Sequence, residues 1–165
     1  MSNKVFNYLG NLDGILVATA HCDIPCKIYD PIIGQIAALS VVRLMDILDD
    51  VPVDSPASKA DQNTIFRCIL RKEEEAEKVK HEVGVIWGDY FKVPQFEQFP
   101  KASELVHGIM QKASACKQGV DRNDGEELLN LVNEFAKMFW ESKGVSTMLR
   151  ESPYPPNLMV VYPEL

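Results

Sequence analysis

Apolar residues recur at helical spacing in four stretches of this 165-residue chain. The first stretch begins at Asp30-Pro31, where the aspartate suits an N-cap and the proline suits the first helical position. It ends at Asp49-Asp50, and its apolar stripe comprises positions 33, 36, 37, 44, 47 and 48. The two prolines between Val51 and Ala57 predict a loop after this helix.

A longer second helix is predicted to start at Ser55-Pro56 or at Asp61 and to run to about Phe91. Its apolar positions repeat about every 3.5 residues and are 65, 69, 76, 79, 83, 86 and 90. The run from Arg71 to Lys80 is dense in charges of both signs, which is typical of a solvated helix face. Pro94 is expected to break the helix.

Two further helices complete the pattern. The third starts near Pro100 and turns five side chains inward: Leu105, Val106, Ile109, Ala113 and Cys116. The fourth runs from about Asp124 to Lys143, and Gly144 marks its end. Its apolar face consists of Leu128, Leu131, Val132, Phe135, Met138 and Phe139.

Four amphipathic helices with short connections predict an all-α fold, an antiparallel up-down four-helix bundle over residues 32–144. No strand pattern competes with this interpretation. The tail, 145–165, contains four prolines, and we expect it to be extended. Its apolar run from Leu158 to Tyr162 should pack on the bundle or on a neighbouring subunit.

Composition narrows the classes of partner. The hydrophobic content of 46% suffices for the core of one domain, and the net charge of −7 argues against a nucleic-acid partner. No stretch approaches the ~20 apolar residues of a membrane span, so we expect no membrane partner. Since an acidic protein repels anions at long range, attraction of an anionic substrate would have to come from local lysines.

The densest chemistry lies near the N-terminus. His21, Cys22 and Cys26 fall within six residues, with Pro25 between the two cysteines. Two thiolates and an imidazole at this spacing can chelate one transition metal. The other cysteines, 68 and 116, fall in helical patterns and are expected to act as small apolar residues. The histidines at 81 and 107 also fall in helical segments and are expected to be structural or on the surface.

The segment from His21 to Pro31 resembles the metal hook of the nickel-containing superoxide dismutases. A second block, Val85 to Glu97, resembles the same family at the end of its second bundle helix, and Phe139-Trp140-Glu141 is a weaker third match. The resemblance spans about residues 21–144. It implies an enzyme that converts superoxide to oxygen and hydrogen peroxide, with one nickel ion per subunit, in a homohexamer.

The resemblance also implies a ligand set in a hook formed by residues 21–31. Cys22 and Cys26 would give two sulfurs, and the Cys22 backbone nitrogen and the His21 amine would give two nitrogens. The His21 imidazole would bind axially in the oxidised state. Asp23 and Pro25 would support these ligands, and the family has a cis bond before this proline.

Further roles are implied around the hook. Tyr29 and Tyr90 would frame the substrate pocket, while Asp89 and Lys92 would help hold the hook against the bundle. In one respect the chain departs from the family type, which orients the axial imidazole with a glutamate and an arginine. The corresponding positions here are Ala37 and Glu75. We expect Glu75 to accept the imidazole N–H directly.

An amine ligand at His21 requires the twenty preceding residues to be removed. Ala18-Thr19-Ala20 is a small-residue cleavage site, so we expect residues 1–20 to be a propeptide cut between Ala20 and His21 by a processing peptidase. The leader has neither the positive region nor the long apolar core of an export signal, which favours a cytoplasmic location.

Two other functions fit part of this pattern. The hook could bind copper or zinc in a metal-delivery protein, or Cys22 and Cys26 could form the redox switch of an interaction module. Neither alternative requires cleavage at His21 or the aromatic block at residues 87–92, and these two features separate the three hypotheses.

Overall fold

A computed structural model describes residues 27–52 and 58–165. Its helices are α1 (Ile32–Asp49), α2 (Lys59–Val85), the π-helical turn η2 (Ile86–Tyr90), α3 (Val93–Gln98), α4 (Ala102–Gln118) and α5 (Arg122–Ser142). Two strands follow, β1 (Thr147–Glu151) and β2 (Met159–Pro163). The chain is therefore mostly helical, as the pattern predicted.

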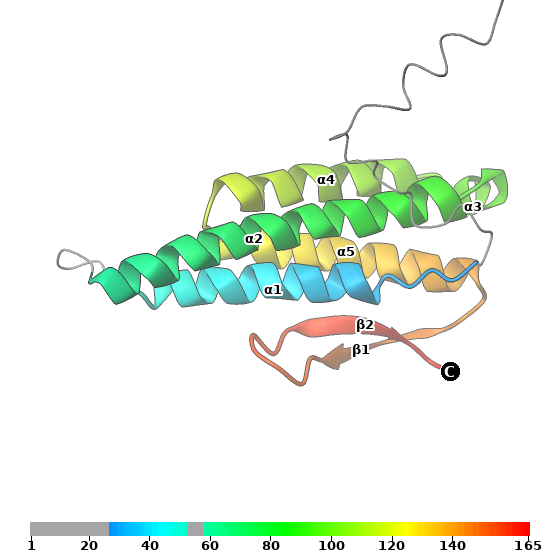
Figure 1. The fold of residues 1–165 in the computed structure, drawn as a ribbon. Coiled ribbons are helices and arrows are strands. Elements are labelled where there is room, and N and C mark those ends of the chain that lie inside the picture. The colour runs from blue at the N-terminus through cyan, green and yellow to red at the C-terminus, as the bar shows by residue number, and fades with distance from the viewer. Residues whose placement is uncertain (1–26, 53–57) are drawn as a thin grey trace, which may run out of the picture.

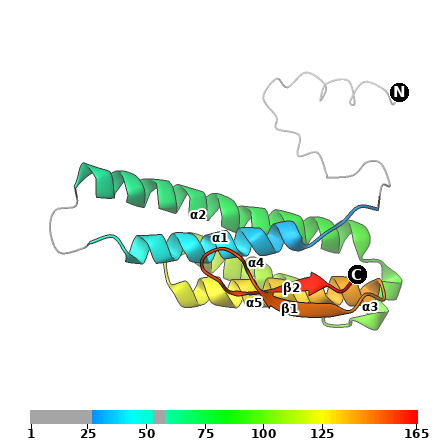
Figure 2. The ribbon, with the colours of Figure 1, turned by 90° about the horizontal axis from the view of Figure 1, so that it is seen from below.

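The four long helices lie side by side along one common direction (Figure 1). α1 packs on α2 and α5, and α4 packs on the same two helices. The two strands lie across α1 and α5 on the face away from α2 (Figure 2). Tyr29, just before α1, and Tyr90, at the end of η2, meet at one end of this arrangement.

Local capping explains where the helices begin. Asp30 Oδ1 accepts the Ile32 N–H at 2.9 Å, but α1 starts one residue later than predicted, with Pro31 rather than Asp30 at the N-cap position. The start of α2 is neither of the two predicted ones: Ser58 caps it and exchanges hydrogen bonds with Asp61 in a capping box. Asp121 caps α5.

The core confirms the inward faces predicted for α4 and α5, apart from Leu105 and Leu131, which are half-buried. The stripe predicted on α1 is partly wrong, because Ile33 and Ile36 are each 41% exposed. The face that α1 buries between α2 and α5 is lined mostly by small side chains: Ala37, Ala38, Val41, Val42 and Met45. On α2, Ile69 is likewise 39% exposed, contrary to prediction.

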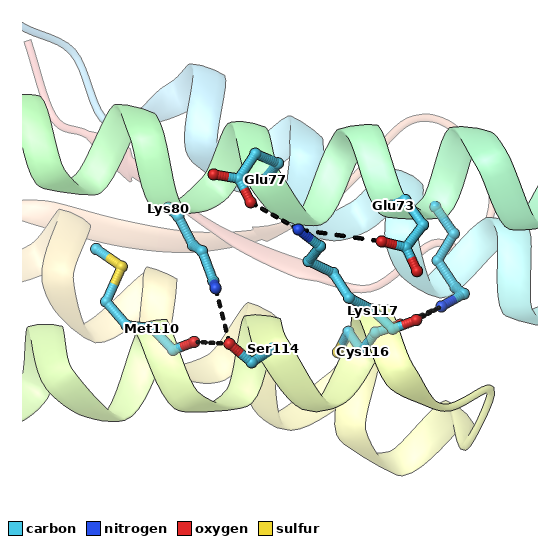
Figure 3. A network of polar contacts seen from close by, with 8 residues as sticks. Glu73, Glu77, Lys80, Met110, Ser114, Cys116 and Lys117 are labelled. Atoms are coloured by element: carbon cyan, nitrogen blue, oxygen red, sulfur yellow. Dashed lines mark hydrogen bonds and ion pairs between the residues drawn. The ribbon is translucent and has the colours of Figure 1, made fainter.

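The charged run on α2 is not wholly a solvated face. Lys72 is 1% exposed, and its ammonium donates to the carbonyls of Cys116 and Lys117 at the end of α4. Figure 3 shows the neighbouring contacts between the two helices, in which Lys117 Nζ lies 2.8 Å from a carboxylate oxygen of Glu77. The bonds from Lys72 join α2 to the last carbonyls of α4, which lack amide donors within their own helix.

The end of α2 differs from a continuous α-helix. Its last turn is a π-helical turn, closed by the Phe91 N–H donating to the Ile86 carbonyl at 3.2 Å. Such turns are rare and are often found at functional sites. Pro94 then lies in the first turn of the short α3, where its missing N–H removes no hydrogen bond.

The tail, which we expected to be extended, contains two strands that the sequence pattern did not indicate. β1 and β2 form an antiparallel hairpin, in which Thr147 pairs with Pro163 and Glu151 with Met159. The predicted packing of the tail's apolar run on the helices is confirmed, since Val160 and Val161 are buried. Single-chain periodicity missed the strands because each is only five residues long and the prolines obscure the pattern.

Two buried amides hold this hairpin. Gln35 Nε2 donates to the Val161 carbonyl at 3.0 Å, and Asn133 Nδ2 donates to the Met159 carbonyl at 2.9 Å. The two amides also bond to each other at 2.9 Å. The tail therefore ties α1, which follows the hook, to α5. Among the described helices, none is long and apolar enough to cross a membrane.

Candidate metal centre and tyrosine site

The predicted metal ligands lie outside the described residues. This applies to His21, Cys22 and Cys26, to the supporting residues at 23 and 25, and to the cleavage site at Ala20. The description begins at Lys27, directly after Cys26, with a φ of 59°. This φ lies in the left-handed region, which residues other than glycine seldom adopt.

The chemistry of the donor set fits nickel. Two thiolates and an imidazole are donors that transition metals prefer over hard oxygen ligands, and a planar arrangement with nitrogen donors is one that divalent nickel adopts. In residues 27–52 and 58–165, no group of three histidine, cysteine, aspartate or glutamate side chains is placed to hold a metal ion.

Both predicted tyrosines are described, and they meet. The Tyr29 and Tyr90 rings lie 5.8 Å apart between centroids, tilted by 54°. Tyr90 also contacts Phe139 of α5 edge-on at 4.9 Å and Phe91 at 5.6 Å. The π-helical turn places Tyr90 at this junction while Phe91, one residue later, enters the core at 2% exposure.

Two residues at the end of α5 complete this arrangement, and sequence reasoning did not single them out. Ser142 Oγ lies 2.8 Å from Tyr90 Oη. The Lys143 ammonium lies 5.0 Å from the centroids of both the Tyr90 and Phe139 rings, within the range of a cation–π contact. We call Tyr29, Tyr90, Phe139, Ser142 and Lys143 the tyrosine site.

In the sequence, little pointed to a role for Ser142 and Lys143. Phe139-Trp140-Glu141 resembled the family, and Ser142 and Lys143 follow directly. Nothing in the periodicity connects the end of the fourth helix with Tyr90, because that contact spans 52 residues of sequence.

Asp89 and Lys92 lie on the exposed surface beside the tyrosine site. Lys92 Nζ donates to the Gly88 carbonyl at 3.2 Å, which fixes the side chain along the π-helical turn. Asp89 is part of that turn. Both residues are therefore next to the segment that carries Tyr90, although residues 21–26 of the hook they are expected to contact lie outside the described residues.

Glu75 is placed differently. It is 5% exposed in the middle of α2, and its carboxylate pairs with Arg71 at 2.6 Å. Fifteen residues separate it from Tyr90, roughly 20 Å of helix. Ala37, at the other departing position, is fully buried in α1. The structure therefore joins the two tyrosines but leaves Glu75 apart from them.

Comparison with known proteins decides the family. The sequence model described as nickel-containing superoxide dismutase matches residues 16–143. The chain belongs to the nickel-containing superoxide dismutase family. It is 36% identical over 128 residues to "Superoxide dismutase [Ni]" of Streptomyces coelicolor, covering 78% of this chain and 92% of that protein. With the protein of the same name from Streptomyces seoulensis it shares 36% identity over 125 residues, 76% of this chain and 89% of the relative.

The fold agrees with solved nickel superoxide dismutases. A native structure superimposes with a TM-score of 0.66 at 36% identity and covers 74% of this chain and 99% of that chain. A structure of the oxidised state gives a TM-score of 0.67 at 35% identity, with 75% and 99% covered. The hairpin of the tail lies beyond the residues matched by the nickel superoxide dismutase model.

Proposed function

We propose that the mature chain begins at His21 and holds nickel through His21, Cys22 and Cys26. Its activity is that of its family: two superoxide anions and two protons give oxygen and hydrogen peroxide. Bound nickel supplies the one-electron couple that takes an electron from one superoxide and returns it to the next. Family membership, together with this donor set, carries the proposal.

The chain's own residues position the small anion and its protons. Tyr29 and Tyr90 restrict access to the hook by their rings, while their hydroxyls order water near it. Lys143 supports attraction of an anion, because its ammonium lies at the Tyr90 ring in a protein of net charge −7. Asp89 and Lys92 hold the hook against the end of α2, and Asp23 and Pro25 shape the loop between the ligands.

We further propose that maturation takes place in the cytoplasm, where a processing peptidase removes residues 1–20. An amino terminus titrates near ~8 and can lose its proton to a metal at neutral pH. An amide nitrogen at His21 in the uncut chain is a much poorer ligand. We therefore expect the uncut chain to be inactive.

The test compares three nickel-treated proteins: the uncut chain, a chain that starts at His21, and a chain that starts at Ala20. The last retains every side-chain ligand and lacks only the free amine of His21. We expect superoxide dismutation in the chain starting at His21 alone, with about one nickel per subunit by metal analysis. Equal specific activities in all three would refute the maturation step.

Glu75 is proposed to orient the His21 imidazole. Glu75→Gln should then lower turnover more than nickel content, since the imidazole loses its acceptor. Glu74→Gln is the matched control, because Glu74 also pairs with Arg71 but is 52% exposed. Equal effects of the two variants would contradict this role.

For the assembly, we propose that the four long helices form an antiparallel up-down bundle and that six copies form a homohexamer. The pairwise packing of α1, α2, α4 and α5 supports the bundle. Exposed apolar side chains on α2 support association, since Phe66 is 70% and Leu70 is 62% exposed.

A further inference from the structure

The contacts of Ser142 fix the direction of its bond to Tyr90. Ser142 Oγ lies 2.6 Å from the Phe139 carbonyl oxygen and 2.8 Å from Tyr90 Oη. Contacts this short between oxygens are hydrogen bonds, so each needs a proton. A carbonyl has none to give and each hydroxyl has one. Ser142 therefore donates to Phe139, and Tyr90 donates to Ser142.

The end of the helix explains why the Ser142 proton is committed to Phe139. α5 ends at Ser142, and the carbonyls of its last turn lack the amide donors found within a helix. In a longer helix the Lys143 N–H would donate to the Phe139 carbonyl. Here it donates to the Trp140 carbonyl instead, at 3.0 Å. The serine hydroxyl supplies the donor that the Phe139 carbonyl would otherwise lack.

Packing fixes the Tyr90 ring as well as its hydroxyl. Phe139 contacts the ring edge-on at 4.9 Å, Tyr29 lies at 5.8 Å, and the Lys143 ammonium lies 5.0 Å from its centroid. A ring held by these neighbours keeps Oη at Ser142. Because Oη gives its only proton to Ser142, it can act toward other groups only as a hydrogen-bond acceptor.

We infer that Ser142 is a positioning residue for dismutation, because it takes the Tyr90 proton and leaves the Tyr90 oxygen as a hydrogen-bond acceptor toward the substrate pocket. This inference rests on the proposed function, which places Tyr29 and Tyr90 at that pocket. Tyr90 then supplies neither of the two protons consumed per hydrogen peroxide. Instead it accepts a hydrogen bond from water and orients that water.

The direction of the bond can be tested in the metal-free chain starting at His21. With ring-labelled tyrosine, an infrared difference spectrum between wild type and Tyr90→Phe isolates the C–O stretch of Tyr90 among the four tyrosines that follow His21. We expect the band of a donating hydroxyl in wild type and in Ser142→Thr, and a shifted band in Ser142→Ala. A band unchanged in Ser142→Ala overturns the inference.

Turnover of the nickel-loaded protein tests the consequence. We expect Ser142→Ala to lower kcat about fivefold, the loss typical of one hydrogen bond, and Ser142→Thr to restore it. In the Tyr90→Phe background the alanine variant should cause no further loss. Wild-type turnover in Ser142→Ala, or the same loss in both backgrounds, overturns the role.

Ser114 offers a matched control on another helix. Its hydroxyl donates to the Met110 carbonyl at 3.0 Å and accepts from Lys80 Nζ at 2.7 Å, the same double contact without a tyrosine (Figure 3). Ser114→Ala should retain wild-type turnover, and a loss equal to that of Ser142→Ala overturns the inference. An inactive nickel-loaded wild type would refute the proposed function, while the infrared spectra would still decide the hydroxyl direction.

Discussion

At the residue scale, single polar side chains set the positions of the tyrosine site and of the tail. Ser142 and Lys143 meet Tyr90 at the tyrosine site, while Gln35 and Asn133 bond the backbone of the tail. Among the described residues, every buried side-chain nitrogen and oxygen that is shielded from solvent has a hydrogen-bond partner. Such groups are held in one orientation because losing a buried partner is costly.

A buried thiol gives a prediction for alkaline pH. Burial raises the pKa of Cys116 from 9.0 to about 11, and Asp124 adds to the shift. The folded state binds this proton more tightly than the unfolded state, so the stabilisation is complete below pH 9 and is lost as the pH rises through about 11. Wild type should therefore lose more unfolding free energy over this range than Cys116→Ala, measured by urea denaturation. Equal pH slopes in the two proteins would contradict it.

At the level of elements, α1 packs closely on its neighbours through small side chains rather than large apolar ones. α1 presents alanines and valines to its neighbours, and Gly125 lets α5 approach it. A Cβ at Gly125 would lie 3.0 Å from Val42 Cγ2 and 3.1 Å from Met45 Sδ. This close approach explains why the apolar stripe read from the sequence of α1 was partly wrong: small side chains face the core, and larger isoleucines remain half outside.

Two glycine substitutions separate packing from helix propensity. Gly125→Ala should destabilise the protein by about 1–3 kcal/mol through overpacking against α1. Gly108→Ala is the control, because the nearest atom to its new Cβ is Leu131 Cδ1 at 4.0 Å. It should stabilise α4 by up to about 1 kcal/mol. Thermal unfolding of both variants checks the prediction, and shifts of the same sign would contradict it.

At the scale of the whole molecule, the net charge affects the approach of the substrate, and the exposed apolar side chains affect assembly. A net charge of −7 opposes the approach of superoxide, so we expect its attraction to depend on lysines close to the hook. The apolar side chains exposed on α2 fit a subunit contact rather than the surface of a lone subunit.

Assembly gives the test at this scale. If the proposed homohexamer uses this surface, Phe66→Asp should shift the protein toward smaller species in sedimentation velocity, because a carboxylate would be buried without a partner. Val120→Asp is the control: Val120 is also an exposed apolar residue, 51% accessible, but lies in the turn between α4 and α5. Dissociation of both variants, or of neither, would count against a contact at Phe66.

Local sequence determined the helices and the family. Periodic apolar residues, an aspartate before a proline, and Gly144 with its φ of 71° act within a few residues, so four long helices and most of their inward faces could be predicted. The closely spaced hook residues identified the chemistry in the same way. Only the tertiary structure decided that Tyr90 meets Tyr29 and Ser142 and that the tail forms a hairpin on α1 and α5. These contacts join residues through packing and turns between elements, and helix periodicity carries no information about them.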